Sequence, residues 1–236
     1  MCSSVVNAIM KILCIESSTQ HASLAVVEGD TVIADANLPD GERHSTSLLP
    51  TLDALLKAHG VGLKELRGIA VGIGPGSFTG IRLGLATARG LSLALNIPIR
   101  GVCCFDNLLS TYEGAASRVC PLVNAHSYGF YTALYERKGR SFAHAREPFV
   151  CQPAEFAKIL EGEVFFMGPH LSIFREVLAQ LFGERATFDS SDRFPTASSA
   201  ARLYESPVAL RDEPPGTVAP LYLLPGVRVT SVSRKP

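Results

Sequence analysis

Short apolar runs separated by tight polar turns open the folded part of the chain. Residues 11–16 (KILCIE) predict a buried strand that ends in a polar turn, and residues 21–28 and 31–36 predict two further strands. Because only short links join these strands, they predict an antiparallel meander.

After these strands, the spacing of the apolar residues changes from that of a strand to that of a helix. Leucines recur at the spacing of one helix face, and Gly60 ends that helix. They are Leu48, Leu49, Leu52, Leu55 and Leu56. A strand at 66–73, a glycine-rich turn at 74–80, a helix at 79–95 and a strand at 97–103 follow. The order β-β-β-α-β-α-β differs from a Rossmann start, which is β-α-β, and is the order of an actin-like, ribonuclease-H-like lobe.

The second half weakly repeats the first. Strands are predicted at 119–124, 131–137, 141–149 and 164–167, and helices at 153–161, 171–182 and 196–204. We therefore expect an α/β protein of two actin-like lobes, each a mixed sheet flanked by helices, with the second lobe smaller and divergent. The expected division is an N-terminal extension (1–9), a first lobe (10–106), and a second lobe with the C-terminal tail (107–236).

Composition narrows the classes of function. The hydrophobic fraction of 47% supports a buried core, while 22 basic and 22 acidic residues give zero net charge. A protein that binds nucleic acid alone usually carries a basic excess, so we expect any role with RNA to be indirect or shared with a basic partner. The six cysteines lack C-x-x-C spacing and indicate reduced, buried thiols. With no signal peptide or apolar run of about 20 residues, we expect a cytoplasmic protein with no membrane association.

The strongest local motif is the glycine-rich turn GPGSFTG at residues 74–80. Glycines at the start of a helix permit positive φ and leave backbone N–H groups that attract anions. Gly74, Gly76 and Ser77 are therefore candidates for anion or nucleotide contact. No Lys-Ser/Thr pair follows, so the turn is not a Walker P-loop. A tight strand-to-helix connection that needs glycine for packing also explains the motif and is slightly favoured on mechanism alone.

The helix after this turn carries small residues at every fourth position: Gly80, Gly84, Ala88 and Ser92. Interior glycines cost about 1 kcal/mol each in a helix, so close packing is the expected compensation. The partner in that packing is either this chain's own sheet or a helix of another protein. In the second case, the leucine-rich helix would accompany it, and Arg82 and Arg89 would flank the contact with charge.

The turn after the first strand holds Glu16, Ser17 and Ser18. In an actin-like ATPase, an acidic residue and hydroxyls at this position contact phosphate and metal, but a lone acid is more often simple turn chemistry. None of the six histidines is paired at i and i+4, and no G-x-S-x-G elbow is present. We expect neither a metal nor a cofactor.

Residues 74–84 (GPGSFTGIRLG) closely resemble the TsaB (YeaZ) family, the inactive homologues of the glycoprotease-like TsaD. Residues 15–19 (IESST), the segment RHS at 43–45 with LLP at 48–50, and PLYL at 220–223 are similar to other family motifs. The resemblance is dense over residues 11–106 and thin afterwards. It implies two actin-like lobes and a non-catalytic partner of a TsaD-like protein in tRNA threonylcarbamoylation, within a larger complex that includes a TsaE-like ATPase.

The resemblance also implies that the first-lobe helices form the surface for the TsaD-like protein or for self-association in isolation. The candidate interface residues are Leu48, Leu52, Leu55, Leu56, Gly80, Arg82, Leu83, Gly84, Thr87, Ala88 and Leu91. The chain departs from the family in the second lobe. Asn124-Ala125-His126 replaces the usual D-A-R, Gly129-Phe130-Tyr131 replaces E-V-Y, and Leu224 replaces an arginine.

Three functions are therefore weighed. A scaffold without catalytic residues is favoured over an ATP-binding, actin-like phosphotransferase or ATPase that acts alone. The latter needs an acidic pair for Mg²⁺, of which only Glu16 is present. A peptidase, the third possibility, lacks every expected ligand.

Overall fold

The first five-stranded sheet is built around the meander that the sequence predicts. The computed structural model describes residues 10–39, 44–204 and 217–224, so the expected extension at 1–9 lies outside the described residues. Strands β1 (Lys11–Glu16), β2 (Ser23–Glu28) and β3 (Thr31–Asn37) pair antiparallel, while β4 (Leu66–Gly74) and β5 (Ile99–Cys103) add parallel strands. The resulting order is β3-β2-β1-β4-β5.

Both faces of this sheet are covered, because its central strands are apolar on both sides. Leu13 and Ile15 face helices α1 (His44–Ala58) and α2 (Phe78–Leu95), and the single-turn η1 (Leu63–Glu65) follows α1. Ile12 and Cys14 face the opposite way and pack with helix α6 (Ala197–Tyr204). This alternation along β1 follows from the two-residue period of a strand.

The second sheet repeats the arrangement. Strands β6 (Arg118–Asn124), β7 (Phe130–Lys138) and β8 (Ser141–Cys151) form an antiparallel meander, and β9 (Val164–Met167) and β10 (Ala186–Phe188) extend it with parallel pairs. The order is β10-β9-β6-β7-β8. Helices α4 (Pro153–Ile159) and α5 (Leu171–Phe182) cover one face, and α3 (Cys104–Leu109) covers the other. The 3-10 turns η2 (His126–Tyr128) and η3 (Gly183–Arg185) complete the described elements.

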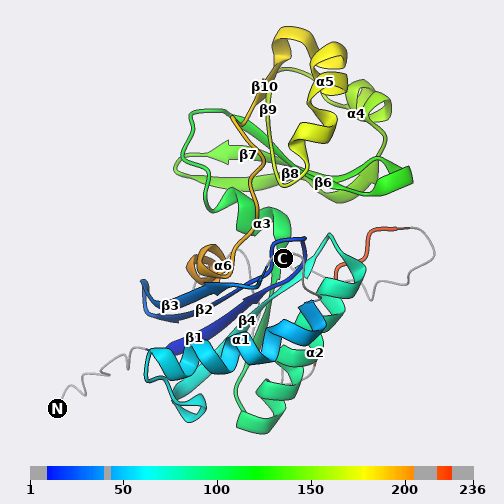
Figure 1. Ribbon diagram of the computed structural model, residues 1–236. Coiled ribbons are helices and arrows are strands. Elements are labelled where there is room, and N and C mark those ends of the chain that lie inside the picture. The colour runs from blue at the N-terminus through cyan, green and yellow to red at the C-terminus, as the bar shows by residue number, and fades with distance from the viewer. Residues whose placement is uncertain (1–9, 40–43, 205–216, 225–236) are drawn as a thin grey trace, which may run out of the picture.

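Helices α3 and α6 lie between the two sheets and contact each other (Figure 1). Helix α3 leads from the first sheet into the second, and α6 returns the chain to the first sheet. The predicted α/β class, with two mixed sheets flanked by helices, is confirmed. The sheets have equal strand numbers, although the second was expected to be smaller, and the sequence pattern missed α3 and β10.

The predicted strands and helices otherwise match the observed ones to within a few residues. Among the described residues, no helix combines the length and the apolar character that a membrane span requires. The predicted domain boundaries at residues 9/10 and 106/107 stay predictions.

Candidate functional site

The turn after β1 and the glycine-rich turn before α2 are in direct contact. The backbone N–H of Ser77 donates to the carbonyl oxygen of Ser18 at 2.7 Å. The Ser17 hydroxyl donates to the carbonyl oxygen of Gly80 at 2.9 Å. The two turns that hold the candidate anion-contact residues are therefore brought together, but they bind each other.

Glycine is required here by this close approach. A Cβ added at Gly76 or at Gly80 would collide with the carbonyl oxygen of Ser18 or of Ser17, respectively. The Ser77 hydroxyl also caps α2 by accepting the N–H of Gly80 at 3.2 Å, so this N–H is already satisfied. Of the two interpretations of the motif, the structure favours the tight strand-to-helix connection.

The carboxylate of Glu16 is completely buried below these turns. It accepts the N–H of Ser18 at 2.7 Å and the side-chain amide of Asn107 at 3.2 Å. Burial raises the pKa of this carboxyl, and the hydrogen bonds from Ser18 and Asn107 oppose that rise. A Cβ at Gly72 would lie 2.6 Å from the carboxylate oxygens, so the β4 backbone closes that side.

Asn107 links Glu16 to helix α6. Its amide also donates to the carbonyl oxygen of Thr196 at 3.0 Å, and its own carbonyl accepts the Ser199 hydroxyl. Sequence reasoning missed this network because α3 was not identified. The available signal was the amide side chain beside Asp106 in the short segment CFDNLL that follows β5.

Helix α1 places its predicted interface leucines inward. Leu48, Leu52, Leu55 and Leu56 all belong to the core of the first sheet and are buried. They cannot form a contact surface in this conformation, which corrects the expectation from sequence. The helical stripe was identified properly, but its function is to cover the chain's own sheet.

The small-residue stripe of α2 is also internal. Gly80, Gly84 and Ala88 are buried, and a Cβ at Gly84 would collide with the Ser17 hydroxyl. The structure thus corrects the interface assignment of these three residues as well. Leu83, Thr87 and Leu91 are half-buried at the margin, and Arg82 is exposed.

The outward side of the two helices carries different residues. Leu49 on α1 and Phe78 and Leu93 on α2 are 58%, 49% and 62% exposed. Ala86 and Gly90 are also exposed, and no atom lies within 4 Å of a Cβ added at Gly90. With Arg82, these α2 residues recur about every fourth position and therefore share one side of the helix. We call Leu49 and this side of α2 the outer helix face.

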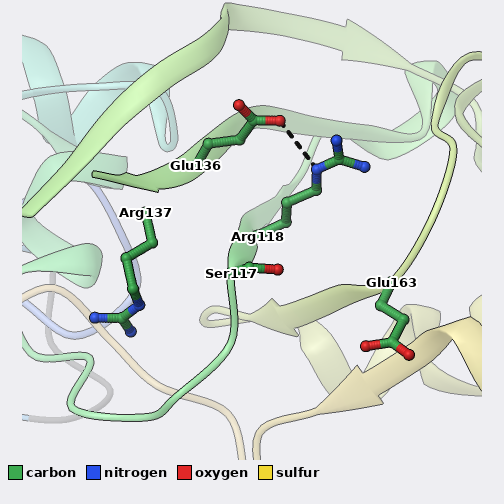
Figure 2. Close-up of a pocket in the computed structure, with 5 residues that line it drawn as sticks. All are labelled: Ser117, Arg118, Glu136, Arg137 and Glu163. Atoms are coloured by element: carbon green, nitrogen blue, oxygen red, sulfur yellow. Dashed lines mark hydrogen bonds and ion pairs between the residues drawn. The ribbon is translucent and has the colours of Figure 1, made fainter. Parts of the chain in front are cut away.

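The described residues contain no group of three or more His, Cys, Asp or Glu side chains arranged to hold a metal ion. A hollow of about 420 Å³ on the second sheet is lined by Ser117, Arg118, Glu136, Arg137 and Glu163 (Figure 2). Arg118 donates to Glu136 at 3.0 Å and to the backbone oxygen of Glu161 at 2.5 Å. Arg118 and Glu136 therefore neutralise each other, while Arg137 donates to the backbone carbonyls of Ala116 and Gly114.

Comparison with known proteins places these features in context. Residues 40–206 match the family model described as "TsaD: tRNA N6-adenosine threonylcarbamoyltransferase". The Haemophilus influenzae "tRNA threonylcarbamoyladenosine biosynthesis protein TsaB" is 33% identical over 171 residues, which are 66% of this chain and 70% of that protein. The Escherichia coli protein of the same name is 34% identical over 143 residues, which are 58% of this chain and 60% of its own length.

The fold is shared with a solved structure. A Pseudomonas aeruginosa protein, described as similar to peptidase YeaZ, superposes with a TM-score of 0.77 at 23% identity. The superposition covers 92% of this chain and all of that protein. At this identity, the likeness shows the fold alone, and it agrees with an actin-like arrangement of both sheets.

Proposed function

This chain belongs to the TsaB (YeaZ) family, and we propose from this premise that it takes part in tRNA threonylcarbamoyladenosine biosynthesis as the non-catalytic partner of a TsaD-type transferase. The Haemophilus influenzae and Escherichia coli relatives are named for that pathway. The observation that carries the non-catalytic assignment is the contact between the turns at Ser18 and Ser77.

That contact occupies the position where an actin-like ATPase holds phosphate. The backbone groups that would face a phosphate bind each other, and the acidic side chain that would face a metal ion is buried against Asn107. A buried carboxylate that already accepts two hydrogen bonds has little capacity to bind an ion from solvent. The site therefore supports a structural function for Glu16.

The proposed contact surface for the transferase is the outer helix face. Exposed apolar side chains on packed helices are typical of protein interfaces, and Phe78 and Arg82 are of the residue types enriched there. The buried leucines of α1 support this surface from below. Self-association in isolation would use the same face and would compete with the transferase.

Reconstitution tests the proposal. The transferase, a TsaE-type ATPase, substrate tRNA and an activated threonylcarbamoyl donor are incubated with and without this chain, and modified adenosine is measured by liquid chromatography and mass spectrometry. We expect modification only when the chain is present, and equal stimulation by a Glu16→Gln variant. Modification by the chain without the transferase, or loss of stimulation in a folded Glu16→Gln variant, would contradict the proposal.

The alternative is an independent ATPase or phosphotransferase. It requires the turns at Ser18 and Ser77 to separate so that a nucleotide can enter, and it predicts ATP hydrolysis by the purified chain that Glu16→Ala abolishes. We expect no hydrolysis above that of a Glu16→Ala control. The same assay in the presence of the transferase separates intrinsic activity from activity at a shared site.

A further inference from the structure

Residues 217–224 lie beside the start of α2 and form hydrogen bonds with β4 and α2. The N–H of Leu221 donates to the carbonyl oxygen of Ile73 at 2.9 Å, and Arg89 on α2 donates to the carbonyl oxygen of Val218, whose side chain is buried. This attachment brings Tyr222 next to the outer helix face, although 140 positions separate it from Arg82 in the sequence.

The guanidinium of Arg82 lies over the Phe78 ring, and the Tyr222 ring lies beside both. The Arg82 Cζ atom lies 3.6 Å from the Phe78 ring centroid and 5.8 Å from the Tyr222 centroid, and the two rings are 5.3 Å apart. The Nε of Arg82 also donates to the Tyr222 hydroxyl at 2.9 Å. Stacking and this hydrogen bond fix the plane of the guanidinium, while the side chain stays exposed.

The charge of this group is not neutralised. Within the part of the chain that the structure describes, Arg82 forms no ion pair. On the neighbouring α1, Lys57 and Asp53 pair with each other at 2.7 Å. Arg82 is therefore an oriented and exposed cation of α2, whereas Arg89, two turns further along the same helix, is half-buried and donates to Val218.

We propose that Arg82 is a preorganised anchor for a carboxylate side chain of the partner protein that binds the outer helix face. This inference rests on the proposed function. It adds the side-chain contact through which the partner would be held on the outer helix face. A planar guanidinium binds a carboxylate through two parallel N–H···O bonds, and its terminal nitrogens are left for that purpose when Nε is bonded to Tyr222. An arginine that is already held in place loses less conformational freedom on binding.

A carboxylate is favoured over an RNA phosphate because of the surroundings. The chain has zero net charge, and the other exposed side chains along α2 are uncharged. Phosphate-binding surfaces usually gather several basic residues, whereas a single arginine among apolar and aromatic side chains is typical of a protein interface.

The test compares dissociation constants for the TsaD-type transferase of the same organism, measured by calorimetry with the full chain and three variants. Arg82→Lys keeps the charge but loses the planar fork, and we expect affinity to fall at least about tenfold, as for truncated interface hot spots. Tyr222→Phe keeps the ring but removes the hydroxyl that orients Arg82, and we expect a smaller fall. Arg202→Lys on α6, which covers the opposite face of the sheet, is the control and should bind like the unmodified chain.

Thermal melting of each variant separates a binding effect from a folding effect. Absence of binding by the unmodified chain would overturn the proposed function, whereas normal binding by Arg82→Lys would overturn only this inference. Filter binding of tRNA to the complex covers the phosphate alternative. A loss of tRNA affinity in Arg82→Lys with unchanged transferase affinity would also overturn the inference.

Discussion

The side-chain amide of Asn107 on α3 donates to the buried carboxylate of Glu16 at the end of β1, across 3.2 Å. The same amide bonds Thr196, which directly precedes α6. One amide side chain thus joins the first sheet to both helices that lie between the sheets. A buried network of this kind is stabilising only while each member is satisfied.

Asn107→Asp tests this dependence. The substitution replaces the donor with a second carboxylate that faces Glu16 and the Thr196 carbonyl, so we expect the free energy of unfolding to fall by at least about 1–3 kcal/mol. Urea unfolding at pH 7 measures it. Asn124→Asp is the matched control, because the Asn124 Oδ1 only accepts the N–H of His126 and an aspartate still accepts it. Equal effects of the two substitutions would argue against the network.

Glu16→Gln tests the electrostatic cost of the buried carboxylate. Burial raises the pKa of Glu16 above its usual 4.5, so the folded state holds the proton to a higher pH than the unfolded chain. The carboxyl therefore contributes its full stability below pH 4.5 and loses it as the pH rises through the folded pKa. Relative to Glu16→Gln, the unmodified chain should lose stability from pH 4.5 upward in urea titrations. Parallel stability curves would show that Glu16 titrates normally.

Two glycines of α2 distinguish internal from external small residues. A Cβ at Gly84 collides with the Ser17 hydroxyl, which is bonded to Gly80, so we expect Gly84→Leu to destabilise the chain by at least about 1–3 kcal/mol. At Gly90 no atom lies within 4 Å of an added Cβ. Gly90→Ala should therefore stabilise the helix by up to about 1 kcal/mol. Thermal melting measures both, and a stable Gly84→Leu variant would contradict the internal packing.

Buried thiols provide a test of the core. Burial raises the pKa of Cys14 to about 12 and also raises the pKa of Cys104 and Cys120. Because the thiolate is the reactive form, a Cys2→Ser/Cys103→Ser variant should react slowly with a disulfide reagent at pH 8 and rapidly in denaturant. Mass spectrometry of this variant, treated with the reagent in the absence of denaturant, identifies which cysteines are modified. Fast modification of Cys14 without denaturant would show that the first sheet opens.

The sequence pattern predicts the local elements well because periodicity records burial. Strand 11–16 and helix 171–182 match the observed bounds, and four of the five α1 leucines, all but Leu49, lie on the buried helix side. Periodicity shows that one side of a helix is buried, but it does not show what covers that side. The small-residue stripe through Gly84 was therefore assigned to a partner protein, whereas Ser17 of the same chain packs against it.

Contacts between distant segments were beyond sequence reasoning for a related reason. Asn107 meets Glu16 across 91 positions, and Tyr222 meets Arg82 across 140. Neither pair has a local signature, because the step from β5 into α3 brings Asn107 to Glu16, and the attachment of residues 217–224 brings Tyr222 to Arg82. The short α3 and β10 were missed because six and three residues are too few for a period to show.

Two neighbouring leucines on α1 separate folding from partner binding. Leu48 is 1% exposed in the core of the first sheet, whereas Leu49 is 58% exposed on the outer helix face. An aspartate at position 48 would bury an unpaired charge, so we expect Leu48→Asp to prevent stable folding. Leu49→Asp should change the free energy of unfolding by no more than about 0.5 kcal/mol, since surface substitutions are usually within that range.

The same pair then reports on the interface. Leu49→Asp should melt at nearly the temperature of the unmodified chain and yet bind the TsaD-type transferase at least about tenfold more weakly, because a charge replaces apolar contact area. Lys57→Ala, on the same helix but in an exposed ion pair, is the control and should alter binding little. Normal transferase binding by Leu49→Asp would exclude the outer helix face at α1 and restrict the contact to α2 around Arg82.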